Sequence, residues 1–132
     1  NAEAVLVFDP AIAAKLPFLM KRGGQVVSKA RFISAQLERY LADDRWLARA
    51  RQSNANAARL AQRLRAVRGV ELIGAVQVNM LFARLPEEAV AALDRGPFRY
   101  YKLGRDQRFV CRHDQEPAGI DLLVRTIEEA MA

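Results

Sequence analysis

The sequence predicts an α+β fold: a small, mainly antiparallel sheet with helices on one face, preceded by a long linking helix. Two observations predict this class. Residues 28–67 contain neither Gly nor Pro and repeat apolar side chains close to the helical period. Beyond Gly69, short strand-like runs come in two pairs, and a helical stretch follows each pair.

The first 27 residues predict a strand, a short helix and a hinge. Residues 4–8 form an apolar run with β-branched and aromatic side chains, typical of a strand buried on both faces. Asp9 is the expected N-cap and Pro10 the first position of a helix that runs to about residue 16, where Pro17 interrupts it. The Lys-Arg-Gly-Gly run at residues 21–24 predicts a flexible basic hinge.

The rest of the chain predicts a helical stretch and then a small sheet. Ser28 is the expected N-cap of the long helix. One straight helix over 28–67 would span roughly 60 Å, so a bend or break is expected near residues 42–45 or at 53–54. After Gly69, strands are expected at 70–73, 79–84, 98–102 and 107–111, and helices at 86–93 and from 116 to the C-terminus.

Composition limits the function classes. The chain has 132 residues, 52% of them hydrophobic and 27% charged, which is typical of one globular domain. No apolar run approaches the ~18 residues of a membrane span, and no secretory signal is visible, so a cytoplasmic protein without a membrane partner is expected. The single Cys111 and single His113 argue against a disulfide framework and a metal site. Because the chain opens at Asn1 directly on a strand-like run, we expect a segment of a longer protein.

The net charge of +6 has two interpretations. Of the 21 basic residues 17 are Arg, and residues 45–70 contain no acid. This run could be a helix face that follows phosphates, or a solvated face. No aromatic residue follows Trp46 among these arginines, so stacking on bases has no platform. We expect no nucleic-acid partner, although a basic, mainly helical binding module stays as the alternative that is not an enzyme.

A specific resemblance begins at residues 21–36, Lys-Arg-Gly-Gly-Gln-Val-Val-Ser-Lys-Ala-Arg-Phe-Ile-Ser-Ala-Gln. This run resembles the segment of low-specificity L-threonine aldolases that reads approximately K-R-G-G-x-x-x-S-K-x-R-F-x-S-A-Q. Further runs follow in the family's order: residues 43–47 resemble its D-x-x-W-L, residues 50–55 its A-R-x-x-N-A, residues 76–82 its P-V-x-x-N-x-V-F strand, and residues 108–110 its R-[LF]-V-T strand.

The resemblance implies a fold-type-I enzyme of amino-acid metabolism that depends on pyridoxal 5'-phosphate. Such a lyase cleaves β-hydroxy-α-amino acids, such as threonine or phenylserine, to glycine and an aldehyde. It implies that residues 1–27 end a large cofactor-binding domain with its hinge, and that residues 28–132 form the small C-terminal domain with the linking helix. The implied partners are the amino-acid substrate, the rest of its own chain and further copies in a homo-oligomer, a dimer or tetramer. Another β-eliminating lyase or an aminotransferase of the same fold type is the alternative enzyme.

The resemblance also assigns site residues. In the family the Schiff-base lysine, the histidine that stacks on the cofactor ring and the aspartate at the pyridine nitrogen lie upstream, so this segment is expected to hold no catalytic residue and to be inactive alone. Arg108 corresponds to the arginine that binds the substrate carboxylate, and a planar guanidinium suits that task. Arg31 corresponds to an arginine that helps to hold the cofactor phosphate, and Lys21 is a second candidate there.

The chain departs from the family after the clamp arginine. The family often reads V-T-H or V-T-S, whereas residues 110–114 read Val-Cys-Arg-His-Asp. Arg112 could compete with Arg108 as the clamp. His113 is either a proton carrier or an ordinary surface histidine. Cys111 is expected to pack in the core, because no base is positioned to activate it, and Asn79 is expected to be structural.

Overall fold

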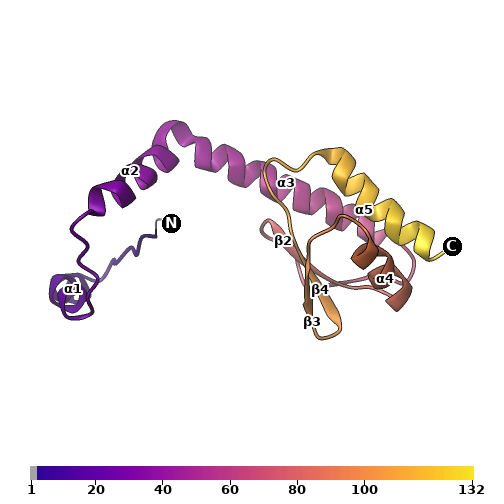
Figure 1. The fold of residues 1–132 in the computed structure, drawn as a ribbon, viewed down its shortest axis with the longest axis horizontal. Coiled ribbons are helices and arrows are strands. Elements are labelled where there is room, and N and C mark those ends of the chain that lie inside the picture. Colours follow the sequence, from indigo (N-terminus) through magenta and orange to yellow (C-terminus); the bar gives the residue numbers. More distant parts are fainter. Residues whose placement is uncertain (1–2) are drawn as a thin grey trace. The chain divides into compact units, whose positions relative to one another are not determined.

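The computed structural model describes residues 3–132, which form two compact units (Figure 1). The first unit extends to Trp46 and the second comprises Leu47–Ala132. The first carries helices α1 and α2, and the second carries the sheet with helices α4 and α5. Helix α3 begins at Arg45 and continues into the second unit, where it contributes to the core.

Helix α1 (Pro10–Arg22) begins as the sequence predicts. Asp9 is the N-cap, its carboxylate accepts from the backbone N–H of Ala11 at 2.8 Å, and Pro10 fills the first position. The predicted interruption is wrong, since the helix continues through Pro17 although this residue has no N–H to donate. Leu16 and Met20, on either side of it, line one hollow of the first unit, together with both apolar and polar residues.

The predicted strand at residues 4–8 is also wrong. The backbone there is extended but irregular, and among residues 3–132 no strand pairs with it. Val5 is 82% exposed and Phe8 91% exposed. A strand needs a hydrogen-bonded neighbour, and its apolar sequence cannot supply one.

The predicted break in the long helical stretch is confirmed near residues 42–45. Helix α2 (Ala30–Leu41) is followed by the 3-10 turn η1 (Ala42–Asp44) and by helix α3 (Arg45–Arg65). Asp43 and Asp44 adopt positive φ angles of 58° and 53°, which Asp tolerates better than most residues. Helix α3 runs without a break through residues 53–54. The expectation of Ser28 as N-cap is wrong: Lys29 holds that position and makes no side-chain cap bond.

The second unit holds an antiparallel sheet of four strands, as predicted. Its strands and helices are β1 (Glu71–Ile73), β2 (Met80–Arg84), α4 (Glu87–Arg95), β3 (Tyr101–Leu103), β4 (Asp106–Val110) and α5 (Pro117–Ala130). The strand order is β1-β2-β4-β3, and every neighbouring pair is antiparallel. Strands β3 and β4 form a hairpin whose turn contains Gly104 at φ 61°.

One face of this sheet packs against the helices. Leu81, Ala83, Gln107 and Phe109 alternate along β2 and β4 and are buried, whereas the residues between them are not. The core that they enter also contains buried residues of three helices: Ala57, Leu60, Ala61 and Leu64 of α3, Ala89 and Leu93 of α4, and Ile120, Leu123, Val124 and Ile127 of α5. The opposite sheet face therefore stays open to solvent, and we call it the open face.

Candidate functional site

Arg108 lies at the centre of the open face. It occupies the middle of β4, directly opposite Phe82 of β2 on one side and Tyr101 of β3 on the other. Residues in register on neighbouring strands point to the same face, so the three side chains form one cross-strand row. The sheet therefore presents an arginine between two aromatic side chains.

The guanidinium of Arg108 is held by a ring and not by an acid. Its Cζ lies 4.2 Å from the centre of the Tyr101 ring, which is the geometry of a cation–π contact. Its Nε is buried and has no hydrogen-bond partner. Within residues 3–132 no ion pair involves Arg108. Because buried donors in proteins are normally satisfied, this nitrogen is an exception that needs an explanation.

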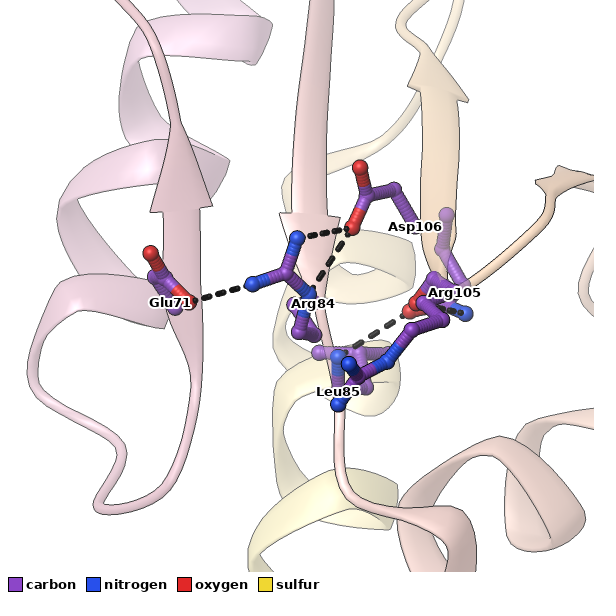
Figure 2. Close-up of polar contacts among 6 residues, drawn as sticks. Glu71, Arg84, Leu85, Arg105 and Asp106 are labelled. Atoms are coloured by element: carbon purple, nitrogen blue, oxygen red, sulfur yellow. Dashed lines mark hydrogen bonds and ion pairs between the residues drawn. The ribbon is translucent and has the colours of Figure 1, made fainter.

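Arg84, on the same open face, shows the opposite arrangement (Figure 2). Its Nη1 donates to Glu71 at 3.0 Å, and its Nε and Nη2 lie 3.0 and 2.9 Å from Oδ1 of Asp106. Two carboxylates thus occupy this guanidinium, and it ties β1, β2 and β4 together. Because its charge and donors are already used by these two carboxylates, we expect no anionic ligand to bind Arg84.

Arg112 is occupied as well. Its Nε and Nη2 donate to the two carboxylate oxygens of Asp114 at 2.9 and 2.5 Å. The Arg112 hydrogen bonds lower the pKa of the Asp114 carboxyl, which favours the ionised form that pairs with the guanidinium. Of the two arginines that sequence reasoning left in competition as the clamp, Arg108 is the one whose guanidinium lacks a carboxylate partner among the described residues.

Two hollows of the second unit do not include Arg108 in their lining. A hollow of about 620 Å³ between α4 and the β3–β4 hairpin is lined by Arg84, Lys102 and Asp94, among others. Lys102 donates to Asp94 there, so both strand cations of this hollow are already paired. A shallower hollow of about 350 Å³ lies beside Arg112.

The remaining residues singled out near the clamp have structural surroundings. Cys111 is buried, and its burial raises the pKa of its thiol to about 11, which agrees with core packing. Asn79 donates through its side-chain Nδ2 to the backbone carbonyl of Cys111 at 3.0 Å. The backbone carbonyl of Asn79 in turn accepts from the Cys111 N–H at 2.8 Å. Asn79 thus fixes the start of β2 against the end of β4, a structural role as predicted. His113 is exposed.

Lys21 and Arg31 lie in the first unit, and both side chains are exposed. Lys21 belongs to the last turn of α1 and Arg31 to the first turn of α2. In the first turn of α2 the N–H groups of Ala30 and Phe32 already donate to the carbonyls of Val27 and Lys29, at 3.2 and 3.1 Å. The feature that fits a phosphate group is therefore the exposed positive charge of the two side chains.

Sequence reasoning missed two residues that shape this region. Asn56 on α3 is 4% exposed, and its Nδ2 donates to the carbonyls of Arg112 and Gln115 at 2.8 and 3.2 Å. It thereby anchors the turn that follows the clamp strand. Tyr101 was read only as part of a strand. Its position opposite Arg108 depends on the register of the β3–β4 hairpin. The turn at residues 104–106 sets this register, so the turn is the sequence signal that could have paired Tyr101 with Arg108.

The described part of the chain has neither a cluster of metal-binding side chains nor a helix fit to cross a membrane. Across residues 3–132, no group of three or more His, Cys, Asp or Glu side chains is placed to bind a metal ion. None of the described helices is both long and apolar enough to span a bilayer.

Comparison with known proteins supports the motif assignment. No family model matches the chain. The chain is 33% identical over 132 residues to a low specificity L-threonine aldolase of a Pseudomonas species, and 35% identical over 131 residues to one of Pseudomonas aeruginosa. Each alignment covers 98% of this chain and 38% of the relative. The resemblance to low-specificity L-threonine aldolases is thereby confirmed, and the chain spans less than half the length of these relatives.

Proposed function

We propose that this chain, which is similar over nearly its whole length to low specificity L-threonine aldolases, is part of a lyase that cleaves β-hydroxy-α-amino acids to glycine and an aldehyde. The structural observation that carries the proposal is the Arg108 guanidinium, which has no carboxylate partner within residues 3–132. A substrate of this class brings the missing carboxylate. We further propose a fold-type-I enzyme, whose small domain is residues 28–132 and which acts as a cytoplasmic homo-oligomer.

In this proposal Arg108 binds and orients the substrate. Two parallel hydrogen bonds from a guanidinium to a carboxylate fix both the position and the plane of that group. The orientation matters, because the bond between the α- and β-carbons must break while the proton leaves the β-hydroxyl, which becomes the aldehyde oxygen. Interactions that hold the substrate in this geometry lower the activation barrier, because the entropic cost of orienting it is met when the substrate binds.

Pyridoxal 5'-phosphate, when bound, supplies the electron sink for the bond that breaks. Within this chain Arg31 and Lys21 would hold its phosphate, since both side chains are exposed cations. No residue of this chain is assigned to the covalent attachment of the cofactor or to its ring. In the proposal these contacts come from the part of the enzyme that this chain does not cover, since the chain spans only 38% of the length of the two relatives.

The test is an assay of the complete protein that carries this chain, loaded with pyridoxal 5'-phosphate. With L-threonine or phenylserine as substrate, we expect equal amounts of glycine and aldehyde. A keto acid formed with ammonia would instead indicate a β-eliminating lyase, and a keto acid formed with transfer of the amino group would indicate an aminotransferase. Either outcome, or no turnover of any β-hydroxy-α-amino acid, would contradict the proposed reaction.

A further inference from the structure

We infer that Tyr101 is a positioning residue that holds the Arg108 guanidinium ready for a carboxylate. The inference rests on the proposed function and adds a second residue to its substrate-binding site. Tyr101 lies on the edge strand β3 directly opposite Arg108, with its ring centre 4.2 Å from Cζ. It is 58% exposed and therefore contributes little to the core.

The contact restricts how the arginine can bind. Nε of Arg108 is buried, so a ligand from solvent cannot reach it. The two terminal nitrogens are then the donors that can meet a carboxylate, in the end-on, two-bond arrangement. A guanidinium that lies against a ring keeps its in-plane N–H groups free, because the ring binds it through its face. Tyr101 thus restrains the arginine without using the donors that the substrate needs.

The other arginines near this sheet show why a ring is suited to this task. Glu71 and Asp106 occupy Arg84, and Asp114 occupies Arg112. A carboxylate partner fixes a guanidinium but competes with any incoming carboxylate for the same N–H groups. A ring partner fixes it without such competition, so the fork of Arg108 stays open to a ligand.

Three substitutions at Tyr101 in the complete protein separate these effects. Tyr101→Phe keeps the ring and should leave KM for phenylserine within about twofold. Tyr101→Gln removes the ring and should raise KM roughly two- to fivefold with kcat nearly unchanged, the fold-change of an exposed cation–π contact. Tyr101→Glu adds a competing carboxylate and should raise KM roughly tenfold.

The inhibition constants of the two products provide a readout that loss of fold would not give. Glycine carries the carboxylate, so its inhibition constant should rise by the same factor as KM in each variant. The aldehyde carries no carboxylate, and its inhibition constant should stay unchanged. Leu103→Gln is the matched control, because Leu103 lies two residues along the same edge strand and is also half exposed. Its KM should equal that of the wild type.

Each outcome decides the inference. The inference is overturned if Tyr101→Gln has the KM and the glycine inhibition constant of the wild type. It is also overturned if Tyr101→Phe and Leu103→Gln raise KM as much as Tyr101→Gln does. If Tyr101→Gln does not fold, Tyr101→Leu gives the same comparison with an apolar side chain. If the wild type itself releases no glycine, the proposed function fails and the inference falls with it, whereas an active wild type with unaffected variants overturns the inference alone.

Discussion

At Arg108 the sheet places a charged side chain among apolar neighbours and gives it no acid within the described residues. The aromatic row of Phe82, Arg108 and Tyr101 crosses three strands, and the guanidinium lies against one of its rings. What the surroundings change is which of its donors are free.

The first prediction concerns Arg108→Lys in the complete protein. A lysine is a point charge and cannot make two parallel hydrogen bonds, so KM for a β-hydroxy-α-amino acid should rise roughly tenfold. Steady-state kinetics measure it. Arg112→Lys is the control, because Asp114 already occupies Arg112. If Arg112→Lys raises KM and Arg108→Lys does not, the clamp has been assigned to the wrong arginine.

The second prediction concerns the thiol of Cys111. Burial raises its pKa to about 11 from the ordinary 9.0, so the folded chain retains this proton where the unfolded chain loses it. The contribution of the protonated thiol to the free energy of unfolding is fully present below pH 9 and is lost as the pH rises through about 11. We therefore expect a thiol reagent to leave Cys111 unmodified at about pH 8 and to modify it rapidly in urea. Fast modification of the folded chain would contradict its burial.

At the scale of elements, a buried side chain of helix α3 helps to fix the turn after β4. Asn56 of helix α3 donates to the carbonyls of Arg112 and Gln115, and its own oxygen accepts from Gln52 at 3.1 Å. Because Asn56 is buried, removing it takes a donor away from two carbonyls, and that of Arg112 keeps only the Gln115 N–H at 3.4 Å. The helix thereby determines where the segment with Arg112 and His113 lies.

The third prediction follows from this anchor. Asn56→Ala should lower the free energy of unfolding of the chain by about 1–3 kcal/mol, the cost of buried groups left unsatisfied. Urea unfolding followed by circular dichroism measures it. Asn56→Asp has the same shape but places oxygens against both carbonyls, so it should be at least as destabilising. An unchanged midpoint for Asn56→Ala would mean that water replaces the side chain without cost.

Other elements show how far local sequence signals reach. Asp9 and Pro10 start α1 as their local chemistry requires, and the break at residues 42–45 falls where a long helix had to end. The strand expected at residues 4–8 does not form, because a strand depends on a partner that no local signal describes. Pro17 lies inside α1 and does not end it, so its local preference does not decide the helix boundary here.

At the scale of the whole molecule, part of the densest basic run is paired with an acid of another helix. Arg59 and Arg63, in the densest basic run, both bind Asp121 of α5, at 3.1 and 2.7 Å. These pairs hold α3 against α5 across the core. Arginines that are already paired with an acid of a neighbouring helix are less available to bind phosphates.

The fourth prediction tests the alternative of a basic binding module. Binding of the chain to duplex DNA or to RNA should be weak in low salt and undetectable at about 150 mM salt, since few phosphates would be neutralised. Fluorescence anisotropy of labelled oligonucleotides over a salt series measures it. Asp121→Asn releases two arginines and should increase the low-salt binding. A steep salt slope for the wild type would favour the module over the enzyme.

By itself the sequence determined the class of the fold, most helix and strand positions and the resemblance in which Arg108 stands out, because caps, turns and hydrophobic period are local properties of the chain. Only the tertiary structure decided which of Arg84, Arg108 and Arg112 has no carboxylate partner among the described residues. That outcome depends on register and helix packing, which bring Glu71 and Asp106 to Arg84, and Tyr101 to Arg108. Each partner is distant in sequence from its arginine or opposite it across a turn, and no local pattern specifies such pairs.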